Sequence, residues 1–230
     1  MKLLLSFLLV TTMMWAVSQT FQSGVTQNLL IELYSSEGCS SCPPADKWMG
    51  KFKDNKVLFK SVFPLTFHVD YWDYIGWQDP FALKKYSQRQ RYYAAIGNSR
   101  QVYTPGFFMN AKEWRGWFQG ESFDLSLKEV GNLIVKRENN RLNIHYNGKA
   151  DEVHIALLGF NQKSIIIRGE NRSRTLIHDF VVLSYDKKDF NKKASYRLPL
   201  LADKTKGYAL VVWVTGDGQR IFKQVTGGYL

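Results

Sequence analysis

Buried-strand patterns alternate with helical patterns over the first half of the chain. Leu29–Tyr34 is a mostly apolar run of strand length. Such runs are typical of strands buried on both faces of a parallel sheet. Apolar spacing and turn residues then predict strands over 57–69 (centred on 65–69) and 106–109, a hairpin partner over 114–118, and helices over 42–52, 81–96 and 122–137.

Two of these helices have recognisable start signals. Pro43 is suited to a first helical turn because its missing N–H bonds nothing there, and Ser40 or Ser41 can cap the same helix. Asp79 and Pro80 are expected to open the helix over 81–96, with the aspartate as its cap.

Short alternating strands replace this pattern after residue 138. Turn residues such as those at 147–148 and 216–218 separate them, which is typical of a β-sandwich or a related antiparallel domain. The chain is therefore predicted to hold an α/β domain over 28–138 and an all-β, sandwich-like domain over 139–230. The predicted strands lie at 142–146, 153–157, 165–167, 176–185, 196–200, 208–214 and 220–225.

The amino-terminal segment reads as a signal peptide over 1–18. Lys2 precedes the apolar Leu3–Val17, and small residues end at Ser18, after which we expect cleavage. The apolar stretch is about 15 residues, shorter than the roughly 20 that a membrane-spanning helix needs. An uncleaved anchor is the alternative. Polar residues over 19–27 are read as a linker, and no membrane span is expected after cleavage, so we expect export to a periplasmic or extracellular location.

Composition supports a packed protein and limits its partners. The chain has 230 residues, of which 45% are hydrophobic and 15% aromatic, so it can form a core without disulfide staples. Its net charge is +11, but no basic run is longer than two residues. We therefore expect a solvated basic surface and no nucleic-acid module.

Cys39 and Cys42 are the only cysteines, and they lie between a predicted strand and a helix start. A loop this short gives little stability when it is closed, so the pair favours a redox or metal role over a structural staple. The Thr104–Pro105 step precedes another apolar strand. This order predicts a thioredoxin-like domain, in which a cis-proline at that position packs beside the cysteine pair.

The expected chemistry is thiol–disulfide exchange with a protein or small-molecule thiol or disulfide. Cys39 is assigned as nucleophile and Cys42 as resolving cysteine, with Pro105 shaping the site. A helix amino-terminus would stabilise the Cys39 thiolate. Pro43 and Pro44 oppose this, because a residue before proline is pushed away from helical angles.

His68 and Asp70 are two residues apart and so share one face of a strand. Either is a candidate proton carrier for the thiols. Alternatively, His68 is a core histidine and Asp70 caps a turn. A metal-binding module is a further alternative, in which Cys39, Cys42 and His68 bind copper.

Two further groups of residues have both a functional and a structural interpretation. The aromatic residues Trp72, Tyr74 and Trp77 either form a substrate rim or pack a loop that anchors the next helix. A set of polar residues in the second half forms either a cluster or an ordinary hairpin turn: Arg168, Glu170, Asn171, Arg174 and His178. A third functional alternative is a non-enzymatic interaction protein with a structural disulfide.

Several motifs together resemble one bacterial family. They are GCSSCPPAD, FHVDYWDYIGWQDPF, SQRQRYY, VYTP and RGENRSRTL, and they are similar to the domain of unknown function 1223 family of exported thioredoxin-like proteins. The resemblance implies a thioredoxin-like fold and export, without naming a reaction. No Trp precedes Cys39, and Ser40–Ser41 replaces the Gly-Pro of thioredoxin, which argues against a general protein reductase.

Overall fold

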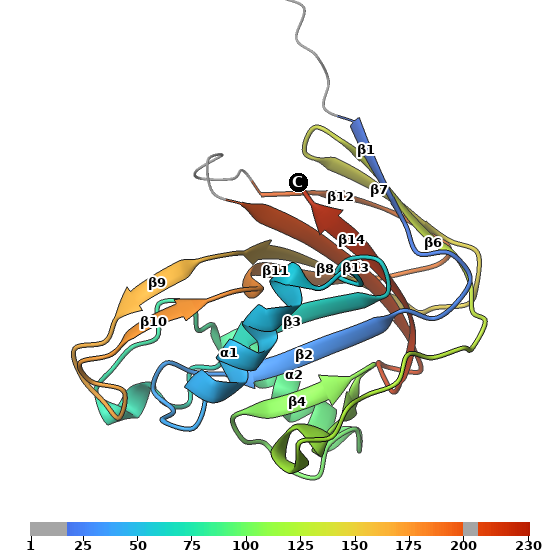
Figure 1. Cartoon of the computed structure of the whole chain (residues 1–230). Helices are drawn as coiled ribbons and strands as arrows, with labels where there is room; N and C mark the ends of the chain where they lie inside the picture. Colours follow the sequence, from blue (N-terminus) through green and yellow to red (C-terminus); the bar gives the residue numbers. More distant parts are fainter. Residues whose placement is uncertain (1–17, 200–206) are drawn as a thin grey trace, which may run out of the picture.

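The computed structural model describes residues 18–199 and 207–230 (Figure 1). The predicted signal peptide therefore lies outside the described residues, apart from Ser18. Strands form an eight-stranded sheet, a four-stranded sheet and a two-stranded sheet. Their bounds are β1 (Ser18–Gln22), β2 (Leu29–Ser35), β3 (Val62–His68), β4 (Gly106–Met109), β5 (Lys112–Glu113), β6 (Leu133–Glu138), β7 (Arg141–Tyr146), β8 (Glu152–Gly159), β9 (Gln162–Ile165), β10 (Thr175–His178), β11 (Val181–Asp189), β12 (Lys193–Arg197), β13 (Tyr208–Gly216) and β14 (Ile221–Tyr229).

Two α-helices cover the part of the large sheet that the first half of the chain builds. β2 and β3 run parallel, and β4 joins the other side of β2 antiparallel. In Figure 1, α1 (Pro43–Gly50) lies in front of these strands and α2 (Lys84–Ala95) lies behind them. Short 3-10 helices complete the set: η1 (Lys51–Asp54), η2 (Asp73–Ile75) and η3 (Gly116–Gln119). Among the described residues, no helix has the length and apolar character needed to cross a membrane.

The large sheet continues without interruption from the first half of the chain into the second. Its order is β14-β13-β8-β11-β3-β2-β4-β5. β11 runs parallel to β3, and Thr66 N donates to Phe180 O at 2.8 Å across the junction. Buried side chains from both halves, such as Phe67 and Trp213, belong to one hydrophobic core. The expected boundary near 138–139 is therefore crossed by one sheet and one core.

The small antiparallel sheet, β1-β6-β7-β12, forms a second layer. Val135 and Ile144 from this sheet share a second core with Val153 and Val212 from the large sheet. The second half therefore packs as two layers, a smaller antiparallel sheet against a larger mixed sheet. One of its layers, however, is the large sheet that the first half also uses.

The helix predicted over 122–137 is wrong. Residues 122–132 have no helix, and Leu133 begins strand β6. Leu125 and Leu127 are exposed and so provide no inward face for a helix, whereas Leu133 and Val135 alternate inward as strand residues do. Pairing of β6 with both β1 and β7 outweighs the helical pattern.

Three other predicted boundaries also need correction. The expected linker over 19–27 contains β1, because Phe21 packs into the second core. The hairpin partner of β4 is β5, not 114–118, which lies partly in η3. Helix α2 begins at Lys84 instead of 81. Asp79 does not cap it, because its Oδ2 accepts a hydrogen bond from Glu37 N and its Oδ1 accepts one from Phe81 N, before the helix.

Candidate functional site

The cysteine pair forms a disulfide between β2 and α1. Cys42 is the N-cap of α1, and Pro43 and Pro44 occupy the first helical positions. Cys42 O accepts hydrogen bonds from Ala45 N and Asp46 N at 2.9 and 3.1 Å. The prediction of Ser40 or Ser41 as cap is wrong, since no side chain caps this helix. Two prolines lack the N–H groups that a cap would bind.

The disulfide is buried. Cys39 is 1% exposed and Cys42 is 0% exposed. Residues 166–174 connect β9 to β10 and contact the cysteine turn, and we call them the strap. Asn171, itself fully buried, donates through Nδ2 to Glu37 O at 2.8 Å and to Cys39 O at 3.0 Å. In this conformation the strap therefore fixes the backbone on both sides of Gly38.

Two further contacts hold the strap in this position. Glu170 Oε2 accepts a hydrogen bond from Ser40 N at 2.9 Å. Arg174 Nη1 donates to Asn171 Oδ1 at 2.9 Å, which orients the amide toward the turn. Three members of the predicted polar cluster thus contact the cysteine turn or one another.

The aromatic loop after β3 covers another side of the turn. A β-carbon built on Gly38 would lie 2.9 Å from Cβ of Trp72, so the glycine allows the indole side chain to approach closely. Trp72 Nε1 donates to Thr104 Oγ1 at 2.7 Å, and the Thr104–Pro105 peptide bond is cis. Tyr74 stacks on Trp72 and is exposed. Trp72 therefore connects the cysteine turn to the Thr104–Pro105 step.

A network of buried charged side chains lies next to the cysteine turn. His178 Nε2 is 3.0 Å from Glu37 Oε1, and His178 Nδ1 is 3.1 Å from Asp46 Oδ2. Burial alone would lower the pKa of His178, but hydrogen bonds and charges from Asp46 and Glu37 outweigh it and raise the pKa to about 10. His178 is therefore an imidazolium at neutral pH. Trp77 Nε1 donates to the other Glu37 oxygen at 2.8 Å.

His68 joins this network from β3. Its Nδ1 lies 2.6 Å from Asp79 Oδ2, and its ring centre lies 4.9 Å from that of His178. Asp79 Oδ2 also accepts from Glu37 N at 2.8 Å. Burial alone would raise the pKa of Asp79, but the charge and hydrogen bond of His68 outweigh it and lower the pKa. The network thus connects β2, β3, β10 and the loop before α2.

Asp70 does not join His68. It lies beyond the end of β3 and accepts a hydrogen bond from Ser87 Oγ of α2. Ser87 Oγ in turn accepts from Asp70 N at 3.1 Å. Asp70 therefore fixes α2 to the end of β3, and His68 and Asp70 have separate partners.

The residues of the alternative copper site have other partners in this structure. The two sulfurs are bonded to each other, and His68 Nδ1 is engaged with Asp79. Across residues 18–199 and 207–230, no group of three or more His, Cys, Asp or Glu side chains could hold a metal ion.

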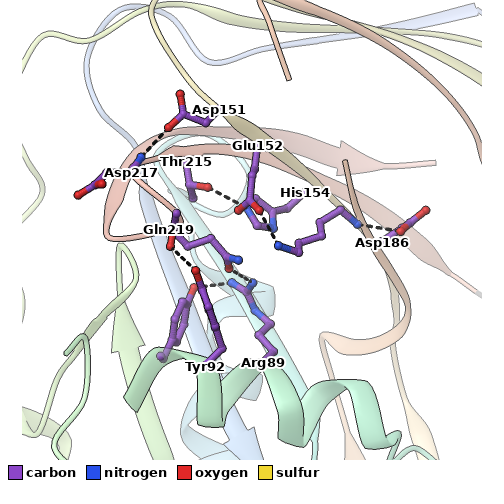
Figure 2. Close-up of polar contacts among 12 residues, drawn as sticks. Arg89, Tyr92, Asp151, Glu152, His154, Asp186, Thr215, Asp217 and Gln219 are labelled. Carbon is purple, nitrogen blue, oxygen red and sulfur yellow. Dashed lines mark hydrogen bonds and ion pairs between the residues drawn. The ribbon is translucent and has the colours of Figure 1, made fainter. Parts of the chain in front are cut away.

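A second polar cluster surrounds Arg89 of α2 (Figure 2). Arg89 Nη1 donates to Gln219 Oε1 at 2.9 Å and to Tyr185 OH at 2.8 Å, while its Nε and Nη2 donate to Glu32. A cavity of about 440 Å³ opens beside Arg89. The guanidinium is already fully bonded, so it acts as a structural ion-pair partner for the buried Glu32.

The sequence pattern did not reveal three members of the charge network. Glu37 and Asp46 were not recognised as partners of His178, and Asp79 was not recognised as the partner of His68. A usable signal was the acid two residues before Cys39 and the acid four residues after Cys42. Carboxylates so close to a buried turn need partners. The partner histidine, 141 residues from Glu37, has no local signal.

Comparisons with known proteins place the chain in a family without assigning a reaction. Protein AGR_C_4864 from Agrobacterium tumefaciens has a similar structure, with a TM-score of 0.60 and 21% identity over 89% of this chain and 94% of that one. HBP35 of Porphyromonas gingivalis has a TM-score of 0.53 and 14% identity over 90% of this chain and 76% of its own. No curated protein matches the sequence. The model of a protein family of unknown function, DUF1223, matches residues 30–215, so the chain belongs to the DUF1223 family.

Proposed function

We propose that the chain is an exported thiol–disulfide oxidoreductase with a thioredoxin-like unit at its centre. The order β2-α1-β3-α2-β4-β5, with sheet order β3-β2-β4-β5 and β4 antiparallel, matches the expected order of such a unit up to the hairpin, whereas the helix expected after the hairpin is replaced by extended chain and strand β6. The observation that carries the proposal is the Cys39–Cys42 disulfide at the start of α1, directly after β2. Export is proposed from the amino-terminal segment and fits a disulfide-permissive compartment.

The exchange is balanced within the pair. A substrate thiolate attacks Cys39 Sγ, the bond to Cys42 breaks, and Cys42 takes up a proton. The second substrate thiol then attacks the substrate sulfur and releases Cys39. The substrate dithiol loses two electrons and two protons, which the protein gains as two thiols. Starting from the reduced pair, the same steps run in reverse.

The charge network supports a disulfide resting state. Glu37 and Asp46 carry two negative charges against one on the His178 imidazolium, close to the first turn of α1. Net negative charge near a sulfur disfavours its thiolate. Cys42 is therefore expected to leave as a thiol after taking up a proton, and the oxidised pair is expected to be favoured.

Trapping of a mixed disulfide tests this proposal. Reduced Cys42→Ser protein is treated with 5,5′-dithiobis(2-nitrobenzoate), and folded Cys39→Ser protein serves as the matched control. We expect the thionitrobenzoate adduct to form faster on Cys39, by about tenfold, because only Cys39 is assigned as the attacking sulfur. Equal rates for the two variants would contradict the assigned roles.

A second candidate function follows from the burial of Cys39. A disulfide that is 1% exposed fits a structural bond in a non-enzymatic interaction protein. In that case neither variant would react in the folded state, and both would react after denaturation. The same experiment therefore separates the two candidates.

A further inference from the structure

The β9–β10 hairpin presents an apolar outer face. Ile165, Ile167 and Ile177 are 64%, 64% and 60% exposed. Ile177 pairs with Lys163, and Ile165 pairs with Thr175, so these side chains share one face of the two-stranded sheet. The opposite face holds the buried Ser164, Ile166 and His178. Figure 1 shows this hairpin projecting from one end of the large sheet.

The hairpin that carries these isoleucines is also positively charged. Residues 163–177 contain four basic residues (Lys163, Arg168, Arg172 and Arg174) and one acidic residue, a net charge of +3. The acid, Glu170, bonds Ser40 N. Exposed cations beside apolar side chains form the pattern that binds anionic lipid headgroups while apolar groups enter the interface.

A tyrosine lies at the same end of the molecule. Tyr74 of η2 is 81% exposed. Its neighbour Ile75 and the nearby Trp77 would each lie 3.3 Å from a β-carbon built on Gly169 of the strap. Tyrosine is enriched at membrane–water interfaces because its ring is apolar and its tip is polar.

We propose that the outer face of the β9–β10 hairpin docks the protein on an anionic lipid surface, with the isoleucines in the interface and the arginines at the headgroups. Side chains exposed to this degree stand out from the surface, and Ile177 also lines a cavity of about 590 Å³ between the hairpin and α1. A bilayer accepts such protruding side chains without the complementary surface that a protein partner must supply. This inference is independent of thiol chemistry.

Hydrogen–deuterium exchange of the full chain on vesicles tests the docking. The apolar Leu3–Val17 segment can itself bind lipid, so the readout is local to residues 163–177. We expect slower exchange in 163–177 on phosphatidylglycerol-containing vesicles than on pure phosphatidylcholine, and loss of this protection at high salt. Protection that is equal on both vesicles, or absent on both, overturns the proposal.

Two sets of variants make the test specific. Ile165→Ser with Ile167→Ser, and separately Arg168→Ser with Arg172→Ser, are expected to weaken the protection about tenfold while the thermal melt stays cooperative. The matched control is Leu127→Ser with Ile221→Ser, which removes exposed apolar side chains elsewhere. An equal effect of the control, or no effect of the hairpin variants, shows binding through another surface or through a protein contaminant and overturns the proposal.

Discussion

At the scale of single residues, His178 joins the two halves of the chain electrostatically. Its imidazolium lies between Glu37 and Asp46, and all three side chains are buried. Removing one partner of a buried charge group leaves the others uncompensated, which costs far more than losing a surface pair. The network is therefore expected to contribute both to stability and to its dependence on pH.

A His178→Gln variant is expected to lose about 3–5 kcal/mol of unfolding free energy near neutral pH, because two buried carboxylates lose their cation. The pKa of His178 rises from 6.5 to about 10 on folding. A raised pKa stabilises the folded state fully below pH 6.5 and loses this contribution as pH rises through about 10. Denaturant titrations from pH 6 upward should therefore show that the difference in unfolding free energy between wild type and variant becomes smaller.

The matched control is His145→Gln. His145 lies in β7, and its Nδ1 is 3.2 Å from Lys192 O. A change of less than about 0.5 kcal/mol is expected there. If the loss of unfolding free energy in His178→Gln does not depend on pH, the imidazolium charge is not what stabilises the site.

Arg89 gives a second prediction at this scale. Arg89→Met leaves Glu32 buried and uncompensated and is expected to cost about 3–5 kcal/mol. Adding Glu32→Gln should recover much of that loss, because no buried charge then remains. A double-mutant cycle by urea denaturation measures the recovery. Additive losses would contradict the assignment of the pair as a mutually compensating ion pair.

The local part of the site could be predicted from the sequence. Cys39 and Cys42 follow β2 directly, and the Thr104–Pro105 step precedes β4 as expected. The partners of His68 could not be predicted, because Asp79 was read as a helix cap and only the folded loop turns it inward. Contacts formed by distant segments carry no signature in the local pattern.

At the scale of elements, the strap holds the turn that carries the disulfide. Asn171 donates to the carbonyls of Glu37 and Cys39, which lie on either side of Gly38. The strap therefore stabilises the cysteine turn, although it lies in the β9–β10 hairpin of the second half. Its opening is expected to limit how fast a reductant reaches the sulfurs.

Asn171→Ala is expected to speed reduction of the disulfide by tris(2-carboxyethyl)phosphine about tenfold, because two hydrogen bonds of about 1 kcal/mol each no longer hold the strap closed. Mass spectrometry after rapid alkylation follows the reaction. Asn143→Ala, on the exposed face of β7, is the control and should leave the rate unchanged. An unchanged rate for Asn171→Ala would show that the strap does not limit access.

Elements were predictable where local pattern and tertiary packing agree. The run Leu29–Tyr34 became β2, and the Cys42–Pro43 step begins α1. They disagree over 122–137, where Leu125 and Leu127 are exposed and strand pairing takes over from Leu133. A strand that is completed by β1, more than 100 residues earlier, cannot be recognised from its own periodicity.

At the scale of the whole molecule, one sheet and one core extend across both halves. Val181 of β11 pairs beside Thr66 of β3, and Trp213 of β13 packs in the same core as Phe67. Separate domains would keep separate cores. The order of strands in such a sheet depends on long-range pairing, which is why the sequence pattern suggested two independent units.

A fragment of residues 28–138 is expected not to fold, because it would expose the β3 edge and leave β6 without β1 and β7. Circular dichroism and amide chemical-shift dispersion measure this. The full chain should unfold in one cooperative transition under the same conditions. Cooperative unfolding of the fragment would show that the first half is an autonomous domain.

The position of Asn171 in the sequence also sets an order of events in time. It lies 132 residues after Cys39, so during synthesis the cysteines emerge long before the amide that holds their turn. Both thiols are therefore expected to be open to oxidation before the strap reaches their turn. The hydrogen bonds that hold the cysteine turn therefore form only after residue 171 has been synthesised.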